Sequence, residues 1–486
     1  MSLGLPEPAA LTRVLPAHVV VAACALGLGA SDAFRIHDPM VLAVVGALGS
    51  LLVAPAGWER IALLAASAFG LAWWWGSIRL DALDHSLLAP RVGTADRFVA
   101  VTTAEARRGA FDLRQMARVH GERVELELPL GRAPPQGARL SLLAVVKAPR
   151  GPDAGFDERT WLRRQGVHVV LRVDEWHAVG RRGGLGGVAD RLRRWLRRSS
   201  SPGLTGERRA LVEGVLLGDD GGLSEPTKQA FRRSGLYHLL AVSGQNVVLL
   251  AGGVMALAVL LGIGGIWTHV GALAAIGAYV LAVGPQPSVI RAGIAGAAVS
   301  IAWLAGRLRD AWHLLLVAAC VLLAWNPYTL FDAGFQLSFG AVVAIFVLGG
   351  PFLRVLEGYP MPDLLRSAVA ISAACTLVTA PILWLEFGRV PLYGVAANAL
   401  VEPAMPLLLG LAFSAAAVDP FLPQVAVALA WANGWVVLYV AACARIVSAL
   451  PGAQVSGRAA TLAAGASIGG TALIWRGLRR ARTARA

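Results

Sequence analysis

Long apolar runs alternate with short polar ones along most of the chain, and one polar interval at about 91–174 separates two groups of runs. A helix crosses a hydrocarbon core of ~30 Å with about 20 mainly apolar residues. The pattern predicts a polytopic α-helical membrane protein with about 12 transmembrane helices. They are expected near 17–30, 40–57, 61–78, 236–262, 268–283, 288–305, 311–325, 333–350, 365–387, 392–418, 421–450 and 459–475.

The polar interval has a different period. Runs such as "RFVAVTTA", "RVELELPL" and "RLSLLAVVKAP" alternate apolar and polar positions, and "GRAPPQG" supplies turn residues between them. Period-two alternation with turns at this spacing is typical of a small all-β barrel or sandwich. We favour an inserted five-stranded barrel of the OB type. Phe98 and Phe111 are expected in its core, with base stacking as the alternative.

An amphipathic helix is predicted after this insert, in "GGLGGVADRLRRWLRRSSS". At helical spacing one face is apolar and the other is rich in arginine, as in helices that lie on anionic lipid. Contact with nucleic acid is the alternative partner. The apolar face carries Leu185, Val188, Leu192, Trp195 and Leu196, and the opposite face carries Arg191, Arg194 and Arg198.

These patterns divide the chain into four parts. Residues 1–80 form N-terminal transmembrane helices, 91–178 the OB-like domain, 180–200 the interfacial helix and 205–480 a second transmembrane domain. Basic segments such as "GRLRD" and "RGLRRARTARA" favour the cytoplasmic side. We therefore expect a multi-pass protein of the inner (cytoplasmic) membrane, with both termini cytoplasmic and the OB-like domain outside.

Composition and charge sharpen this interpretation. Hydrophobic residues make up 56% of the chain and charged residues only 15%, and the mean hydropathy is +0.61. Residues 91–200 contain 22 Lys and Arg against 12 Asp and Glu, so this stretch holds about +10 of the formal net charge of +14. Such a local excess suggests an anionic partner, either phosphate backbone or lipid head groups, with an ordinary solvated basic surface as the equal alternative.

Polar residues interrupt four of the apolar runs, in "VSGQN", "GPQPSVIRAG", "NPYTLFDAGFQLSFGA" and "PLYGVAANALVEPAMP". Polar groups at membrane depth must be satisfied within the protein or line a water-filled path. Broken helices with Gly and polar residues mark such paths in transporters. Helix packing through small residues is the alternative, but four broken segments together favour a conduit.

The same four segments resemble successive motifs of the ComEC family, and "PRGPDAGFDERTWLRRQGV" is similar to the end of that family's OB-like domain. The resemblance implies an inner-membrane channel that passes single-stranded DNA during natural transformation. Asn246 stands where many members have His. Many members also carry a metallo-β-lactamase-like domain, and this chain resembles a form without it, since its nine histidines contain no H-x-H-x-D-H motif.

Each polar residue receives a role from this interpretation. The DNA path is assigned to Ser243, Gly244, Gln245, Asn246, Arg291, Asp332, Gln336, Ser338 and Asn398. Arg291 is expected to contact phosphate, because guanidinium is a planar cation with several donors, and Asp332 is expected to be structural or gating. Contacts from the OB-like domain are assigned to Arg97, Arg114, Arg123 and Lys147.

No catalytic residue, metal site or cofactor is predicted. The four cysteines are separate and lie in apolar segments, which favours packing. The expected partners are single-stranded DNA, membrane lipids and other competence proteins, including a DNA receptor, a cytoplasmic motor and a separate nuclease. Two alternatives stay open: a small-solute permease, and an intramembrane serine hydrolase using Ser243. The hydrolase needs a base near Ser243, and His238 is five residues away on another helical face.

Overall fold

The computed structural model describes residues 16–36, 57–109, 111–153, 156–284, 286–304 and 310–483. The described residues fall into two compact units. One contains residues up to 194 together with 310–330, and the other contains 195–304 and 331–483. Each unit is described by itself below.

The first unit begins with two long helices, α1 (Pro16–Ala33) and α3 (Trp58–Asp84), and it later gains α11 (Ala311–Trp325). A Cβ on Gly27 would lie 2.2 Å from the Phe69 carbonyl oxygen. Only glycine therefore permits the close packing of α1 on α3, as in membrane helix pairs. These helices confirm the predicted helical segments at 17–30, 61–78 and 311–325. The segment predicted at 40–57 lies almost entirely outside the described residues.

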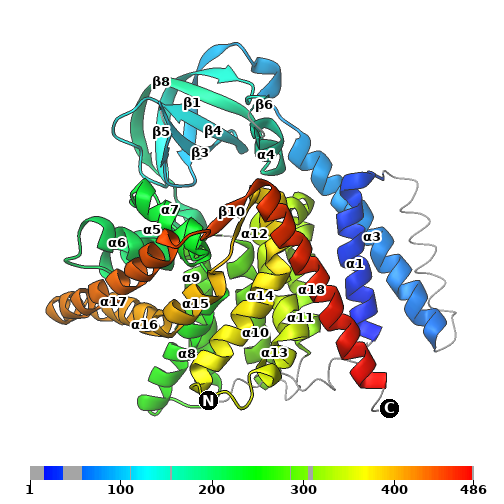
Figure 1. The fold of residues 1–486 in the computed structure, drawn as a ribbon. Helices are drawn as coiled ribbons and strands as arrows, with labels where there is room; N and C mark the ends of the chain where they lie inside the picture. The colour runs from blue at the N-terminus through cyan, green and yellow to red at the C-terminus, as the bar shows by residue number, and fades with distance from the viewer. Residues whose placement is uncertain are drawn as a thin grey trace. The chain divides into compact units, whose positions relative to one another are not determined.

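A β barrel follows α3 (Figure 1). Its five main strands close in the order β1–β3–β4–β8–β5 and back to β1. The β4–β8 pair is parallel and the other pairs are antiparallel. The strands are β1 (Ala95–Thr102), β3 (Leu113–Val119), β4 (Glu122–Leu128), β5 (Ala138–Lys147) and β8 (Val167–Arg181). Smaller elements are η2 (Ala89–Arg91), β2 (Arg107–Arg108), β6 (Pro152–Asp153), β7 (Phe156–Asp157) and α4 (Glu158–Arg164).

Alternation along the strands builds the barrel core. In β5 every second residue, from Ala138 to Val146, is buried. Phe98 is 2% exposed and belongs to this core, as predicted. The core prediction is wrong for Phe111, which is 91% exposed. Phe111 is two residues before the buried Leu113, which would suit an inward position if both belonged to one strand. However, β3 begins only at Leu113. Phe111 lies in the preceding turn, in which the Gly109 amide donates to the Asp112 carbonyl (2.9 Å).

A cluster centred on Asp84 ties the barrel to the helices of the same unit. Asp84 accepts two bonds from Arg163 of α4 (2.9 and 2.7 Å) and one from the Tyr328 hydroxyl (3.0 Å), and it pairs with Arg35. The Asp84 carboxylate raises the pKa of Arg163. Tyr328 lies in η4 (Pro327–Phe331). One carboxylate thus joins the end of α3 to the barrel and to the segment after α11.

The amphipathic helix predicted at 180–200 is present as α5 (Gly184–Ser199). Leu196 is buried, whereas Leu185 is 78% exposed and Trp195 is 43% exposed. The apolar face is therefore only partly covered by the chain.

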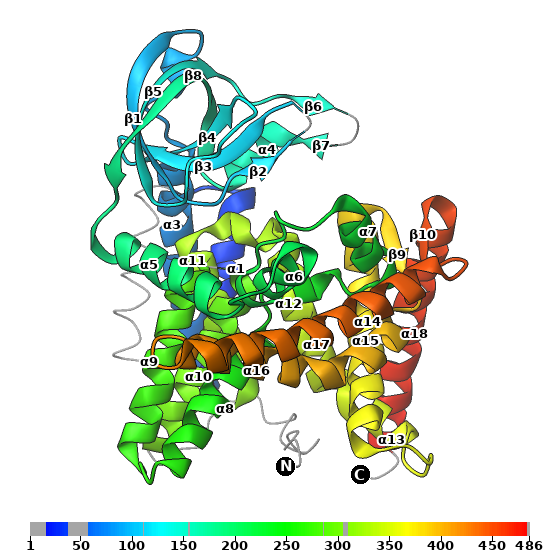
Figure 2. The ribbon, with the colours of Figure 1, turned by 90° about the vertical axis from the view of Figure 1, so that its left-hand side faces the viewer.

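The second unit is helical. It contains α6 (Gly206–Leu217), α7 (Glu225–Ser234), η3 (Tyr237–Leu240), α8 (Gly244–Leu260), α9 (Ile266–Val283), α10 (Pro287–Leu304), α12 (Ala333–Ala344), η5 (Ile345–Gly349), α13 (Gly350–Val355), α14 (Asp363–Phe387), β9 (Arg389–Pro391), α15 (Gly394–Val401), η6 (Glu402–Ala404), α16 (Met405–Val418), α17 (Pro423–Ala449), β10 (Gln454–Ser456) and α18 (Gly457–Thr483). In Figure 2, α16 and α17 run crosswise to α14 and α18.

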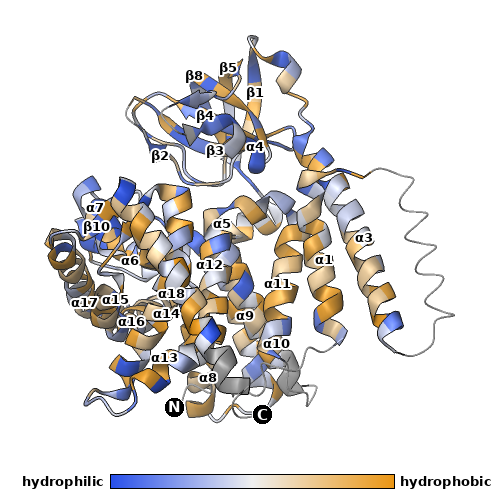
Figure 3. Cartoon of the chain, turned by 45° about the vertical axis from the view of Figure 1, so that its right-hand side comes forward, coloured by the Kyte–Doolittle hydropathy of each residue, from blue (hydrophilic) through white to orange (hydrophobic). Residues whose placement is uncertain are grey.

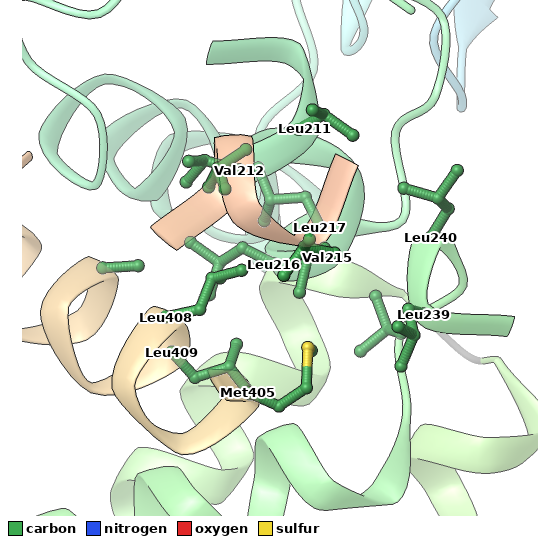
Figure 4. Close-up of a cluster of buried hydrophobic side chains, with 14 of the residues drawn as sticks. Leu211, Val212, Val215, Leu216, Leu217, Leu239, Leu240, Met405, Leu408 and Leu409 are labelled. Atoms are coloured by element: carbon green, nitrogen blue, oxygen red, sulfur yellow. The ribbon is translucent and has the colours of Figure 1, made fainter. Parts of the chain in front are cut away.

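The core of this unit forms where α6 meets α16 and η3 (Figure 4). Leu216 and Leu408 are fully buried, and Met405 is 1% exposed. Burial of one such side chain contributes about 1.5–3 kcal/mol. This apolar contact holds α6, which is amphipathic and short, against the apolar helices.

Seven helices of the described residues are long and apolar enough to cross a membrane, and α8 and α11 are shorter apolar helices. Apolar colours dominate α1, α11 and α14 in Figure 3, whereas the barrel strands alternate. The protein is therefore a helical membrane protein with an inserted β barrel. The number of about 12 transmembrane helices stays a prediction. The run predicted at 236–262 is divided, because η3 ends at Leu240 and α8 begins at Gly244.

Candidate functional site

Helix α8 begins inside the "VSGQN" segment. Ser243 is its N-cap, with extended backbone (φ −97°, ψ 161°), and its hydroxyl donates to Asn246 Oδ1 (3.0 Å). Asn246 is 1% exposed. Its Nδ2 donates to the Val215 carbonyl (2.8 Å) and to the Tyr279 hydroxyl (3.0 Å). Asn246 thus joins α8 to α6 and α9, which is the geometry of helix packing.

Two further residues in the first turn of α8, Gly244 and Gln245, lie close to α10 and η6. A Cβ on Gly244 would lie 3.3 Å from Ala292 Cβ and 3.6 Å from Arg291 Nη2, so α10 passes close to this glycine. Gln245 Nε2 donates to Glu402 Oε1 (2.8 Å). The first turn of α8 therefore contacts both a cation and a carboxylate.

Both of these charged groups have neutral partners. Arg291 Nε donates to Ser338 Oγ of α12 (3.0 Å). Within the described ranges, no carboxylate forms an ion pair with Arg291, and no cation forms one with Glu402. Both side chains are half-buried. Burying a charged side chain in an apolar bundle costs free energy, and such side chains usually face a polar interior. Arg291 and Glu402 are therefore the groups here that could stabilise water or an ionic substrate.

The remaining predicted path residues lie on neighbouring helices. Asp332 caps α12, and its Oδ1 accepts from the Phe335 amide (3.0 Å), which is a structural role. Gln336 follows in the first turn of α12. Asn398 Nδ2 donates to Ser372 Oγ (2.9 Å), which links α15 to α14. Glu402 was not assigned to the path from sequence, although it belongs to the polar segment "PLYGVAANALVEPAMP".

The four predicted barrel contacts differ in their surroundings. Arg114 pairs with Asp112 (3.3 Å), Glu125 (3.7 Å) and Glu158. Glu125 is 5% exposed, and burial raises its pKa while Arg114 opposes the rise. The charge of Arg114 is therefore neutralised inside the barrel wall.

Lys147 is also paired, with Glu127 at 3.9 Å, and with Arg114 it lines a cavity of about 60 Å³. Arg123 Nη1 donates to the Gln165 carbonyl (3.0 Å). Arg97 is exposed, and none of the described carboxylates pairs with its side chain. Only Arg97 and Arg123 of the four thus keep an unneutralised guanidinium.

Sequence reasoning missed a second exposed group on the barrel. Arg107 and Arg108 are exposed on β2, and the exposed Phe111 follows in the turn before β3. The run "RRGAF" carries the signal, because two cations beside an aromatic ring suit an anionic, stackable ligand.

Comparison with known proteins places the helical unit in a family. The family described as "Competence protein" matches residues 215–482. The chain therefore belongs to the competence protein family, the ComEC family whose motifs its sequence resembles.

Individual relatives agree with this assignment. The chain is 28% identical to ComE operon protein 3 of Bacillus subtilis (strain 168) over 253 residues, which is 51% of this chain and 31% of the relative. It is 27% identical to competence protein ComA of Neisseria gonorrhoeae over 292 residues, or 55% of this chain and 39% of the relative. The alignments thus span about a third of the length of these relatives. No solved structure matches the chain significantly.

Replacing Asn246 with Ala tests its packing role. The change leaves the Val215 carbonyl and the Tyr279 hydroxyl without this donor at a buried position, which costs about 1–3 kcal/mol. We expect a lower melting temperature of the purified protein and lower abundance in membranes. Ser243→Ala is the matched control, because it removes one bond from a half-buried hydroxyl. Equal melting temperatures for wild type and Asn246→Ala would contradict the role.

Proposed function

We propose that this protein transports single-stranded DNA across the cytoplasmic membrane during natural transformation. The observation that carries the proposal is Arg291, a half-buried cation with a neutral partner at the broken start of α8, in a chain of the competence protein family. One of the relatives is named competence protein ComA, and another is ComE operon protein 3.

Electrostatics supports a conduit at this place. A DNA strand carries one negative charge per nucleotide and needs hydrogen-bond donors, cations and water to cross hydrocarbon. Arg291 retains donors beyond Nε and lies close to Gly244, and Glu402 accepts a hydrogen bond from Gln245 on the same first turn of α8. A phosphate entering here would supply the counter-charge that the described residues do not.

The barrel suits a receiving role outside the membrane. Its five strands close with Greek-key connections, since β5 returns to pair with β1 and β8 lies between β5 and β4. OB folds have this kind of barrel and bind oligonucleotides on strand faces and loops. The exposed loop with Arg107, Arg108 and Phe111 lies between the first two main strands, which is one of those loops. We place this domain outside and both termini inside, in a bundle of about 12 spans.

The two alternatives have weaker support. A small-solute permease would not explain the presence of the basic barrel. A serine hydrolase needs a base on Ser243, but the Ser243 hydroxyl donates to Asn246 and His238 Nδ1 contacts the Gly235 carbonyl. We therefore propose a transporter without enzymatic activity that works with a separate nuclease, a DNA receptor and a cytoplasmic motor.

Arg291→Gln tests the path. The variant should reduce uptake of labelled DNA at least tenfold while its abundance in membranes stays near normal, because the side chain contributes one bond to packing. Arg354→Gln in α13 is the matched control, since it removes an exposed arginine with no ion pair to any described residue. The strain background is a deletion complemented by each variant. Uptake that falls only in proportion to protein level would contradict the assignment, and normal transformation in the deletion strain would refute the proposed function.

Purified protein should bind DNA without cutting it. Asp219 and Asp220 are the adjacent acidic pair outside the barrel, yet Asp219 pairs with Arg197 and accepts from the Gly221 amide (3.1 Å). Asp220 accepts from the Tyr237 hydroxyl (2.9 Å). Metal-assisted hydrolysis needs free ligands. End-labelled duplex and single-stranded DNA should stay intact with magnesium, manganese or zinc. Cleavage that is lost in the Asp219→Ala, Asp220→Ala double variant would show that the chain is a nuclease.

A further inference from the structure

Strand register places arginines in a line across the outside of the barrel. Arg123 of β4 is opposite Arg118 of β3, Arg118 is opposite Val101 of β1, and Val101 is opposite Arg139 of β5. Neighbouring strands are ~4.8 Å apart. The line from Arg123 to Arg139 therefore spans roughly 14 Å across four strands.

These side chains point outward, because the residues beside them in each strand point into the core. Ala117 and Val119 flank Arg118 and are buried, as are Ala138 and Leu140 on either side of Arg139. A two-residue turn with positive φ at His120 (50°) and Gly121 (86°) holds Arg118 opposite Arg123. Turns of this kind fix hairpin register.

Arg79 of α3 is a further cation whose charge acts on Arg123. Its Nε donates to the Trp325 carbonyl (2.7 Å), and its guanidinium lies 5.5 Å from the centre of the Trp325 ring. Burial, followed by the charges of Arg118 and Arg79, lowers the pKa of Arg123. The charges of Arg118 and Arg79 thus both act on Arg123 at one end of the line.

No described carboxylate relieves this repulsion. Arg79, Arg118, Arg123 and Arg139 form no ion pair within the described ranges, in contrast to Arg114 and Lys147 on the same barrel. Like charges directly opposite each other across strands are destabilising. The barrel thus pairs some of its cations and leaves Arg118, Arg123 and Arg139, together with Arg79 of α3, for an anion from outside the described chain.

We propose that Arg79, Arg123, Arg118 and Arg139, here called the arginine row, bind successive phosphates of single-stranded DNA. This inference rests on the proposed function and names the contacts made before the strand reaches the helices. A continuous polyanion matches cations set in a line over four strands, whereas a lipid head group would engage only one end. Sequence spacing hides the row, because its members come from four different elements.

The test measures binding of fluorescent oligo-dT to the full-length protein in nanodiscs over a range of salt concentrations. Arg118→Gln, Arg139→Gln is the test variant, because both side chains are exposed and neither bonds to the described chain. The dissociation constant should rise about tenfold. The log–log slope against salt should fall by about 1.4, since each phosphate contact on a single strand contributes about 0.7. Arg132→Gln is the control: it removes an exposed arginine from the loop between β4 and β5.

The outcomes separate the row from the proposed function. Equal affinity and slope for wild type and the double variant would overturn the row alone. An equal loss in Arg132→Gln would also overturn it, because general surface charge would then suffice. If the double variant binds DNA normally but loses thermal stabilisation by phosphatidylglycerol, the row binds lipid head groups and the proposal is wrong. Wild-type protein that binds no oligo-dT would overturn both the row and its role in transport.

Discussion

A polar group inside hydrocarbon must find its partner within the protein, and the helical unit is organised by this requirement. Asn246 satisfies it completely, with a carbonyl of α6 and a hydroxyl of α9. The Ser288 hydroxyl does the same for the Val242 carbonyl before α8 (2.6 Å). Arg291 and Glu402 have only neutral partners. These two charged groups lie next to the break between η3 and α8.

The barrel divides its charges in a similar way. Arg114 is surrounded by three carboxylates and stabilises the wall. The arginine row is formed on the outer surface without such partners. The net positive charge of residues 91–200 is therefore concentrated in particular places, and this distribution decides where an anion is attracted. Asp84 connects this barrel to helices of the same unit.

Period and composition predicted the helical class and the inserted β region, because burial in lipid and in a barrel impose different periods. They also assigned Arg291 to the path, and this assignment stays a prediction. The prediction of a core position failed for Phe111. Its even spacing from Leu113 suits an inward-facing strand position, but Phe111 lies in the turn before β3, where its ring is exposed. Arg114 was not distinguishable from Arg118 in sequence, since ion pairing depends on carboxylates from other strands. Glu402 was not assigned to the site for the same reason: its hydrogen-bond partner Gln245 is 157 residues away in the sequence.

Photo-crosslinking during uptake tests the central claim most directly. A benzophenone amino acid at Gln245, on the first turn of α8, should crosslink to labelled DNA as the single strand enters living cells. The same amino acid at Val259, a side chain of α8 that is 71% exposed, should crosslink to lipid and not to DNA. Uptake that continues without any DNA crosslink at Gln245, or with equal crosslinks at both positions, would contradict a path along the start of α8.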